Sequence, residues 1–100
     1  MFDNLRTTRQ DTDPNVGDRF VESVDRTYTE NGSKGIHHTE VMYEVTALTH
    51  NGFDARGVEV IAESGRPSFA GKRYPADTST VSMVWFGWDA AVKRGDVKSV

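Results

Sequence analysis

Cysteine is absent from the 100 residues of this sequence. A disulfide framework, a thiolate nucleophile and a zinc–thiolate site are therefore all excluded. Long apolar runs are absent too, and no stretch approaches the roughly eighteen residues of a membrane-spanning helix. The first six residues lack the apolar segment of a signal peptide. We therefore expect a cytoplasmic protein that has no membrane partner.

A strong charge of either sign is also missing. The net charge is −3 and the isoelectric point is about 5.5, unlike the strongly basic domains that bind nucleic acids. The charges are divided unevenly, because residues 1–63 carry twelve acidic and six basic side chains, whereas residues 64–100 carry three and six. Such an asymmetry marks a binding face or reflects chance on a mixed surface, and we favour the second interpretation.

Sequence motifs of catalysis are missing as well. The chain has no nucleophile elbow, no phosphate-binding loop and no close pair of carboxylates. His37, His38 and Glu40 resemble metal ligands, but adjacent strand residues point to opposite faces, and His50 lies at the far end of the strand. Three solvent-facing histidines are the simpler interpretation. We predict no catalytic residues, no metal site and no cofactor, and keep a small enzyme with a hidden site as an alternative.

The length and composition are those of one small globular domain. A chain of 100 residues, 36% of them hydrophobic, buries roughly two thirds of its unfolded surface and needs no covalent staples. Residues 1–16 are polar and contain the turn signal Asp13-Pro14. We predict a flexible N-terminal arm at residues 1–16 and a single β-rich domain at residues 17–100.

The strongest structural signal is a β-hairpin. Apolar residues recur at every second position over Val41–Ala47 and again over Val58–Ala62, as half-buried strands require. Between these segments, Asn51-Gly52 can take the two positive φ angles of a type I′ turn. The hairpin is therefore expected to form the centre of the sheet.

Residues 17–29 fit two structures. Phe20, Val24 and Tyr28 are spaced by four, as on a helix, but they also share one face of a strand, and the segment ends in β-favouring residues. We predict a strand, which leads through a glycine-rich connection at residues 30–35 into the hairpin.

Residues 80–100 contain the last predicted elements. Thr80–Trp88 is a nearly continuous apolar run, typical of a strand that is buried on both sides or meets another molecule. Asp89–Gly95 has the charge order and terminal glycine of a short helix, and residues 96–100 could add an edge strand. The predicted fold class is mainly β: a small antiparallel sheet or partly open SH3-like barrel of about five strands with one short C-terminal helix.

The aromatic run supplies the first candidate site. Trp85, Phe86 and Trp88 are three large aromatic residues within four positions, and an extended strand cannot place them all in one small core. At least Phe86 or Trp88 must be covered by the short helix, by the N-terminal arm or by another molecule. Aromatic residues are typical anchors of protein interfaces, so we predict these three as protein-binding residues.

A basic loop supplies the second candidate site. Residues 64–75 contain two glycines and two prolines and no acidic residue, which predicts a loop. Its basic side chains could neutralise phosphates and its aromatic rings could stack on bases. The residues of this alternative nucleic-acid site are Arg66, Phe69, Lys72, Arg73 and Tyr74.

The segments Val16–Val21 and Tyr43–Leu48, with the tight turn that follows, resemble the opening of small SH3-like β-barrel accessory proteins of actinobacteria and their phages. The resemblance spans residues 16–63. It implies a small accessory or host-interaction protein, in the host cytoplasm if a phage encodes it, that binds rather than catalyses. No functional residue can be transferred from this pattern.

Together these observations predict a non-enzymatic binding module that engages another protein, or a second copy of itself, through the aromatic residues at positions 85–88. Nucleic-acid binding by the basic loop is the first alternative, and a small enzyme is the second.

Overall fold

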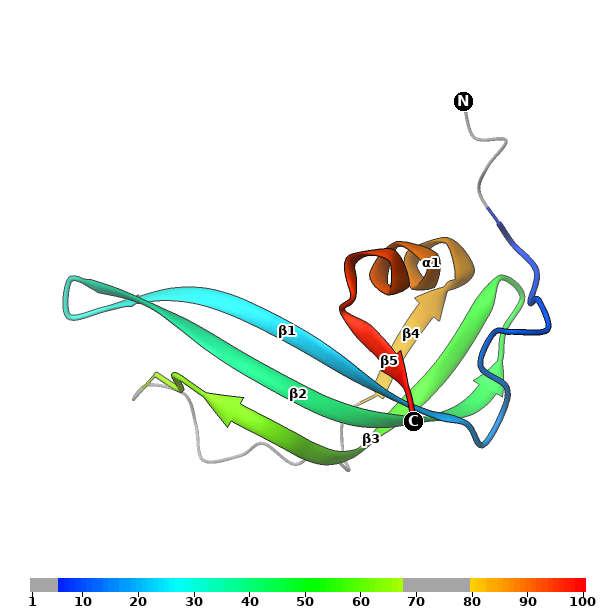
Figure 1. Cartoon of the computed structure of the whole chain (residues 1–100), viewed down its shortest axis with the longest axis horizontal. Coiled ribbons are helices and arrows are strands. Elements are labelled where there is room, and N and C mark those ends of the chain that lie inside the picture. Colours follow the sequence, from blue (N-terminus) through cyan, green and yellow to red (C-terminus); the bar gives the residue numbers. More distant parts are fainter. Residues whose placement is uncertain (1–5, 68–79) are drawn as a thin grey trace.

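The computed structural model describes residues 6–67 and 80–100 and contains one antiparallel sheet and one helix (Figure 1). The strands lie in the order β4-β3-β2-β1-β5. The predicted class, a mainly β fold of about five strands with one short C-terminal helix, is confirmed. The elements are β1 (Arg19–Glu30), β2 (Ser33–Leu48), β3 (Gly52–Ser64), β4 (Thr80–Val84), α1 (Trp85–Arg94) and β5 (Val97–Ser99).

The β1–β2 hairpin closes through a two-residue turn at Asn31-Gly32. Their φ angles are 53° and 80°, both left-handed, as a type I′ turn requires. The strands pair up to the turn, with Glu30 opposite Ser33. The strand predicted within residues 17–29 is confirmed, but the connection predicted at residues 30–35 is wrong, because a single Asn-Gly pair reverses the chain and leaves its neighbours to pair.

The type I′ turn predicted at Asn51-Gly52 is also wrong, since neither residue has a positive φ. Gly52 is the first residue of β3 and lies against β4. A Cβ atom built on Gly52 would stand 1.7 Å from the carbonyl oxygen of Met83. Glycine is therefore required here by the close approach of another backbone. The Thr49 N–H donates to the Gly52 carbonyl at 2.9 Å and closes the connection.

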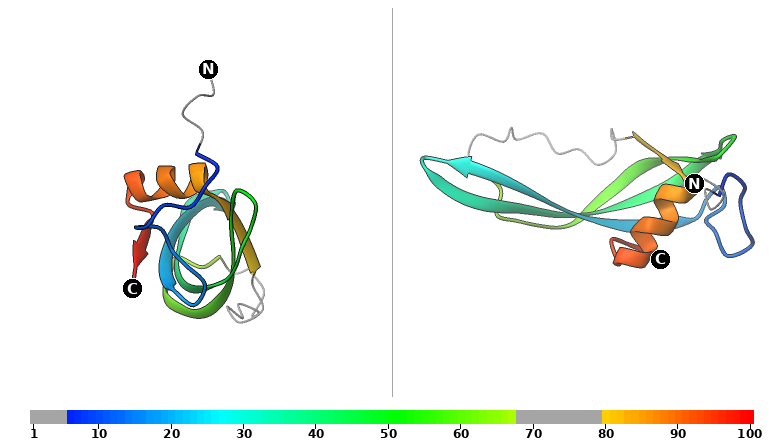
Figure 2. Two further views of the ribbon diagram at one scale, coloured as in Figure 1. Left: turned by 90° about the vertical axis from the view of Figure 1, so that its right-hand side faces the viewer. Right: turned by 90° about the horizontal axis from the view of Figure 1, so that it is seen from above.

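The β2–β3 pair confirms the predicted hairpin and adds three register shifts. Val41, Tyr43 and Val45 are buried, as their alternation predicts. The alternation of burial ends at the shift between Val45 and Ala47, and Thr46, Ala47 and Leu48 are all exposed. Bulges bend and twist a strand, and Figure 2 shows the sheet curling around the face that carries these buried residues, here called the inner face.

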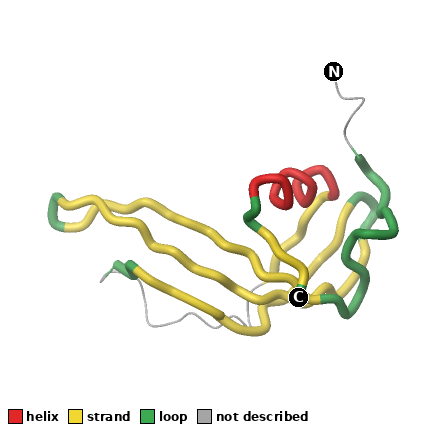
Figure 3. Tube along the Cα trace, in the orientation of Figure 1, coloured by secondary structure: helices red, strands yellow, loops and turns green. Residues whose placement is uncertain are grey.

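The two edge strands are short and lie at the same end of the molecule. β4 pairs with residues 52–56 of β3, and β5 pairs with residues 20–22 of β1. α1 connects these two edge strands and covers the inner face there (Figures 1 and 2). From this end, β1, β2 and β3 extend as a long arm, so that most of the described chain is strand (Figure 3).

The start of α1 differs from the prediction. The strand over Thr80–Trp88 is wrong beyond Val84, and the helix begins at Trp85 rather than at Asp89. The Trp85 N–H donates to the Asn51 carbonyl at 2.9 Å. This bond satisfies one of the N–H groups that a helix start leaves without an intrahelical partner, and it ties α1 to the β2–β3 connection.

The end of α1 follows the prediction. Gly95 has a left-handed φ of 80°, and the Asp96 N–H donates to the Ala91 carbonyl at 2.9 Å. This is the Schellman arrangement, in which glycine meets no steric penalty. The edge strand predicted within residues 96–100 is confirmed as β5.

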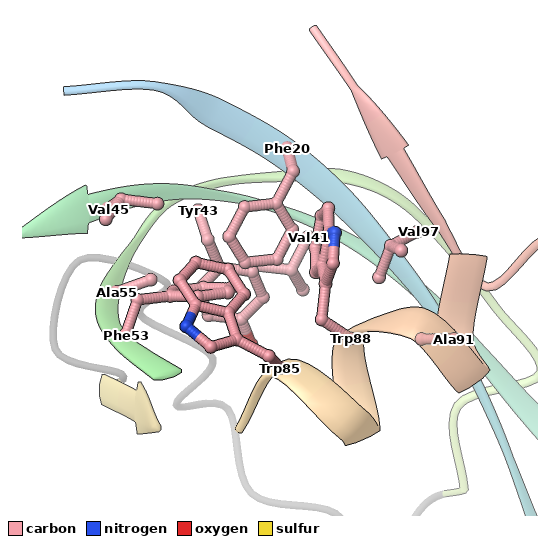
Figure 4. Close-up of a cluster of buried hydrophobic side chains, with 10 residues drawn as sticks. All are labelled: Phe20, Val41, Tyr43, Val45, Phe53, Ala55, Trp85, Trp88, Ala91 and Val97. Carbon is pink, nitrogen blue, oxygen red and sulfur yellow. The ribbon is translucent and has the colours of Figure 1, made fainter. Parts of the chain in front are cut away.

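The core lies between α1 and the inner face (Figure 4). The rings of Phe20 on β1, Phe53 on β3 and Trp88 on α1 contact one another, with centroid distances of 5.1–5.7 Å and near-perpendicular planes. Edge-to-face contacts of this kind are favourable beyond the area they bury. Tyr43 stacks on Phe20, and Trp85 packs on Phe53.

The close approach at Gly52 yields the first testable prediction. Gly52→Ala should lower the free energy of unfolding by about 2–3 kcal/mol, because β4 must move away from the new methyl group. Gly87→Ala is the matched control, since its Cβ would lie 3.6 Å from Val84 and alanine favours helix. Urea denaturation of both variants measures the effect. Equal stability of the two variants would contradict the close approach of β4 to Gly52.

Candidate functional site

The structure separates the three aromatic residues of the first candidate site. Trp85 and Trp88 are 2% and 5% exposed and belong to the core, whereas Phe86 is 52% exposed. The turn of the helix causes this division, because residues three apart share a side and the two residues between them project elsewhere. Phe86 thus remains as the accessible member of the set.

The outward side of α1 forms a small surface around Phe86. Residues four and seven positions along a helix lie on the same side as the first, which places Ala90 and Lys93 in line with Phe86. We call these three residues the outer face of α1. Val84, the residue before the helix, is 44% exposed and adds apolar area beside its start.

The N-terminal segment holds α1 from a second side. All five N–H donors of Arg6 have acceptors: Nε and Nη2 donate to the Asp89 carboxylate, Nη1 and Nη2 donate to the Asp13 carboxylate, and Nη1 also donates to the Thr8 carbonyl. The guanidinium also lies 5.3 Å from the ring centroid of Trp85. Residues 6–16, the described part of the predicted N-terminal arm, therefore contact the domain through Arg6.

The pairing of Arg6 with Asp89 changes both acidities. Hydrogen bonds from the guanidinium lower the pKa of the Asp89 carboxyl, and the carboxylates raise the pKa of Arg6. An ion pair therefore joins the N-terminal segment to Asp89, the fifth residue of α1. Bidentate arginine–carboxylate pairs fix geometry as well as charge, so this contact fixes the N-terminal segment against α1 at Asp89.

Arg66 is the one member of the predicted basic site within the described residues. Its Nε lies 3.9 Å from a carboxylate oxygen of Glu63, and Pro67 after it is buried. Phe69, Lys72, Arg73 and Tyr74 lie outside the described residues. The nucleic-acid site therefore stays a prediction.

The adjacent histidines lie on opposite faces of β2, as the strand period requires. Nε2 of His37 lies 2.6 Å from a carboxylate oxygen of Glu63 on the inner face. His37 is buried, so the prediction that it faces solvent is wrong. Nδ1 and Nε2 of His38 lie 2.5 and 2.9 Å from the carboxylates of Asp25 and Glu40 on the other face.

Two hollows in the described surface bear on the enzyme alternative. One of about 710 Å³ lies at the tip of the β1–β2 hairpin, and its described lining contains a lysine and a tyrosine but no carboxylate or imidazole. Another of about 380 Å³ lies between the N-terminal segment and α1. Both of its carboxylates, Asp13 and Asp89, are bonded to Arg6. Within the described residues, no group of three or more histidine, aspartate or glutamate side chains is arranged so that it could hold a metal ion.

Comparison with known proteins finds no matching family model, no matching curated protein and no matching solved structure. Within residues 6–67 and 80–100, no helix has the length and apolar character needed to cross a membrane.

Two features of the site were missed from the sequence alone. Trp85, Trp88 and Ala91 are spaced by three, and this helical period could have revealed the earlier start of α1. The contact between Arg6 and Asp89 had no sequence signal, because the two residues are 83 positions apart.

The division of the aromatic residues yields the second testable prediction. Trp88→Ala should destabilise the fold by about 3–5 kcal/mol, because it removes the ring that contacts both Phe20 and Phe53. Phe86→Ser should change the free energy of unfolding by less than about 0.5 kcal/mol, as exposed substitutions do. Chemical denaturation checks both, and a large loss in Phe86→Ser would show that Phe86 belongs to the core.

The environment of His38 yields the third prediction. The carboxylates of Glu40 and Asp25 raise the pKa of His38 above its ordinary 6.5, so protonation favours the folded state. This stabilisation is complete below pH 6.5 and is lost as the pH rises through the folded-state pKa. Urea denaturation of wild type and His38→Gln is measured from below pH 6.5 to above the folded-state pKa. The free energy of unfolding should fall with rising pH in wild type, and this fall should be absent in His38→Gln.

The control for the His38 prediction is the double variant Asp25→Asn, Glu40→Gln, which keeps the imidazole and removes both charges. An NMR titration of His38 should then give a lower midpoint than in wild type. An unchanged midpoint would show that the two carboxylates do not set the pKa of His38.

Proposed function

We propose that this chain is a non-enzymatic binding module that engages another protein, or a second copy of itself, through the outer face of α1. The observation that carries the proposal is the 52% exposure of Phe86 on a helix whose opposite side is buried. An exposed phenylalanine on a fixed helix can enter an apolar pocket of a partner at little cost in conformational entropy. Aromatic anchors of this kind contribute much of the binding energy of protein interfaces.

The charges beside Phe86 indicate what the partner surface would look like. Asp89 is engaged by Arg6, whereas Lys93 and Arg94 lie in the last turn of α1. An apolar pocket with acidic groups at its rim would therefore complement this face. Charges at a rim affect association rate and specificity more than affinity, so the main contribution is expected from Phe86.

The finer predictions remain part of this proposal. An accessory role of the phage type rests on the sequence resemblance, and nucleic-acid binding by the basic loop is the rival function. The two functions differ in their response to salt, because a nucleic-acid complex weakens steeply as salt rises and an apolar protein contact does not.

The test is the solution mass by light scattering, at low and high salt, with and without mixed oligonucleotides. A salt-resistant dimer that becomes a monomer in Phe86→Ser would support binding of a second copy. Val16→Ser is the matched control, because Val16 is also an exposed apolar residue but precedes β1. A mass increase with oligonucleotides at low salt alone would favour the rival and overturn the proposal.

If the protein is a monomer without affinity for oligonucleotides, binding to a different protein is tested by capture. Wild type, Phe86→Ser and Val16→Ser are immobilised and exposed to the same extract. A protein that is retained by wild type and Val16→Ser and lost with Phe86→Ser supports the outer face as the contact. Equal retention by all three variants would contradict it.

A further inference from the structure

Most of β1 is paired on one side only within the described chain. β5 pairs with Phe20, Val21 and Glu22, and the Ser23 N–H donates to the Asp96 carbonyl at 2.7 Å. Beyond this point β1 continues to Glu30 with β2 on one side, and no described strand pairs with the other side. We call residues 24–30 on that side the outer edge of β1; it lies on the part of β1 that runs along the arm in Figure 1.

The backbone groups at this edge can be assigned from the bonds at its start. The Ser23 N–H points toward β5, and the Arg19 carbonyl accepts from the Val100 N–H on the same side. Backbone groups alternate sides along a strand, so the odd residues direct their N–H and C=O groups outward. At the outer edge these residues are Asp25, Thr27 and Thr29.

Such an edge is a template for another strand. Natural edges are usually blocked by proline, by charged side chains or by a bulge. Residues 24–30 contain no proline, and the β1–β2 register runs through them without a shift. Their charged residues, Asp25, Arg26 and Glu30, limit which strands can pair with this edge. The segment Thr27-Tyr28-Thr29 also has high β propensity. The edge is therefore regular and able to accept a strand.

We propose that the outer edge of β1 binds the same edge of a second copy of this chain, antiparallel, about a two-fold axis at Tyr28. The backbone limits the registers, because outward groups of one copy must face outward groups of the other. An axis between two residues would pair odd with even positions and is excluded. The axis must therefore pass through a residue.

Charge selects among the remaining registers. An axis at Tyr28 places Arg26 opposite Glu30 of the second copy, and symmetry repeats the pair. An axis at Arg26 would place the two arginines opposite each other, and an axis at Thr27 would leave Arg26 facing Tyr28. Opposite charges at facing positions stabilise a strand pair and like charges destabilise it, so the axis at Tyr28 is favoured.

The expected product is one continuous sheet through both copies. Thr27 and Thr29 would each exchange two backbone hydrogen bonds with the other copy, because residues that face each other at hydrogen-bonding positions bond through both groups. The contact uses the arm, far from the outer face of α1 (Figure 1). It is therefore independent of the proposed function.

Thr27→Pro tests the contact directly. Proline removes an N–H that points away from β2, so the monomer should fold, whereas strand addition is blocked. Sedimentation equilibrium should show a concentration-dependent dimer for wild type and a dissociation constant at least about tenfold higher for Thr27→Pro. Thr27→Val keeps the N–H and the β-branched shape, and it should dimerise like wild type.

Charge reversal tests the register and does not depend on the proline variant. Arg26→Glu and Glu30→Arg should each raise the dissociation constant about tenfold, because two symmetric pairs become repulsive. The double variant Arg26→Glu, Glu30→Arg restores both pairs and should return the dissociation constant to within about threefold of wild type.

Three results would overturn the proposal: a wild-type monomer at every concentration, a dimer unaffected by Thr27→Pro, or a double variant as weak as the single ones. Phe86→Ser separates this contact from the proposed function. A dimer lost in Phe86→Ser but kept in Thr27→Pro would assign self-association to the outer face of α1 and refute the edge contact.

Discussion

The fold depends on the mutual contact of Phe20, Phe53 and Trp88. β1 and β3 are separated by β2, about 10 Å apart across the sheet, so their rings can meet at 5.7 Å only because the sheet curls. Trp88 then closes the triangle from α1. This contact thus links the curvature of the sheet, the position of the helix and the burial of the core. It also brings together Phe20 and Trp88, which lie near opposite ends of the chain.

The position of α1 follows from this contact and from the backbone around it. Gly52 lets β4 approach β3 closely, and Asn51 accepts the first N–H of the helix. Because Trp85 and Trp88 are buried in the core, the helical period directs the side chain of Phe86 away from it. An exposed phenylalanine is therefore a consequence of how the helix is anchored, and a partner surface is what would cover it.

Much of the fold could be predicted, since alternation over Val41–Ala47 and the glycine at position 95 report local physics. The errors arose where tertiary contacts decide. Asn51-Gly52 has the composition of a type I′ turn, but the approach of β4 determines its conformation. The end of β4 and the start of α1 follow each other without a polar break, so Thr80–Trp88 resembles one apolar strand. Phe86 was among the predicted site residues, although its exposure depends on a helix that the apolar run concealed.

The edges of the sheet are protected differently at the two ends of the molecule. At the core end, β4 pairs with the edge of β3 and β5 pairs with the edge of β1. Along the arm, the outer edge of β1 carries charge in place of a covering strand, with Asp25, Arg26 and Glu30 beside Thr27-Tyr28-Thr29. These charges disfavour pairing with most other strands, because an arbitrary register places like charges opposite each other or buries a charge without an opposite one. The same pattern is self-complementary about Tyr28, so in the proposed contact these charges would favour a second copy over other chains.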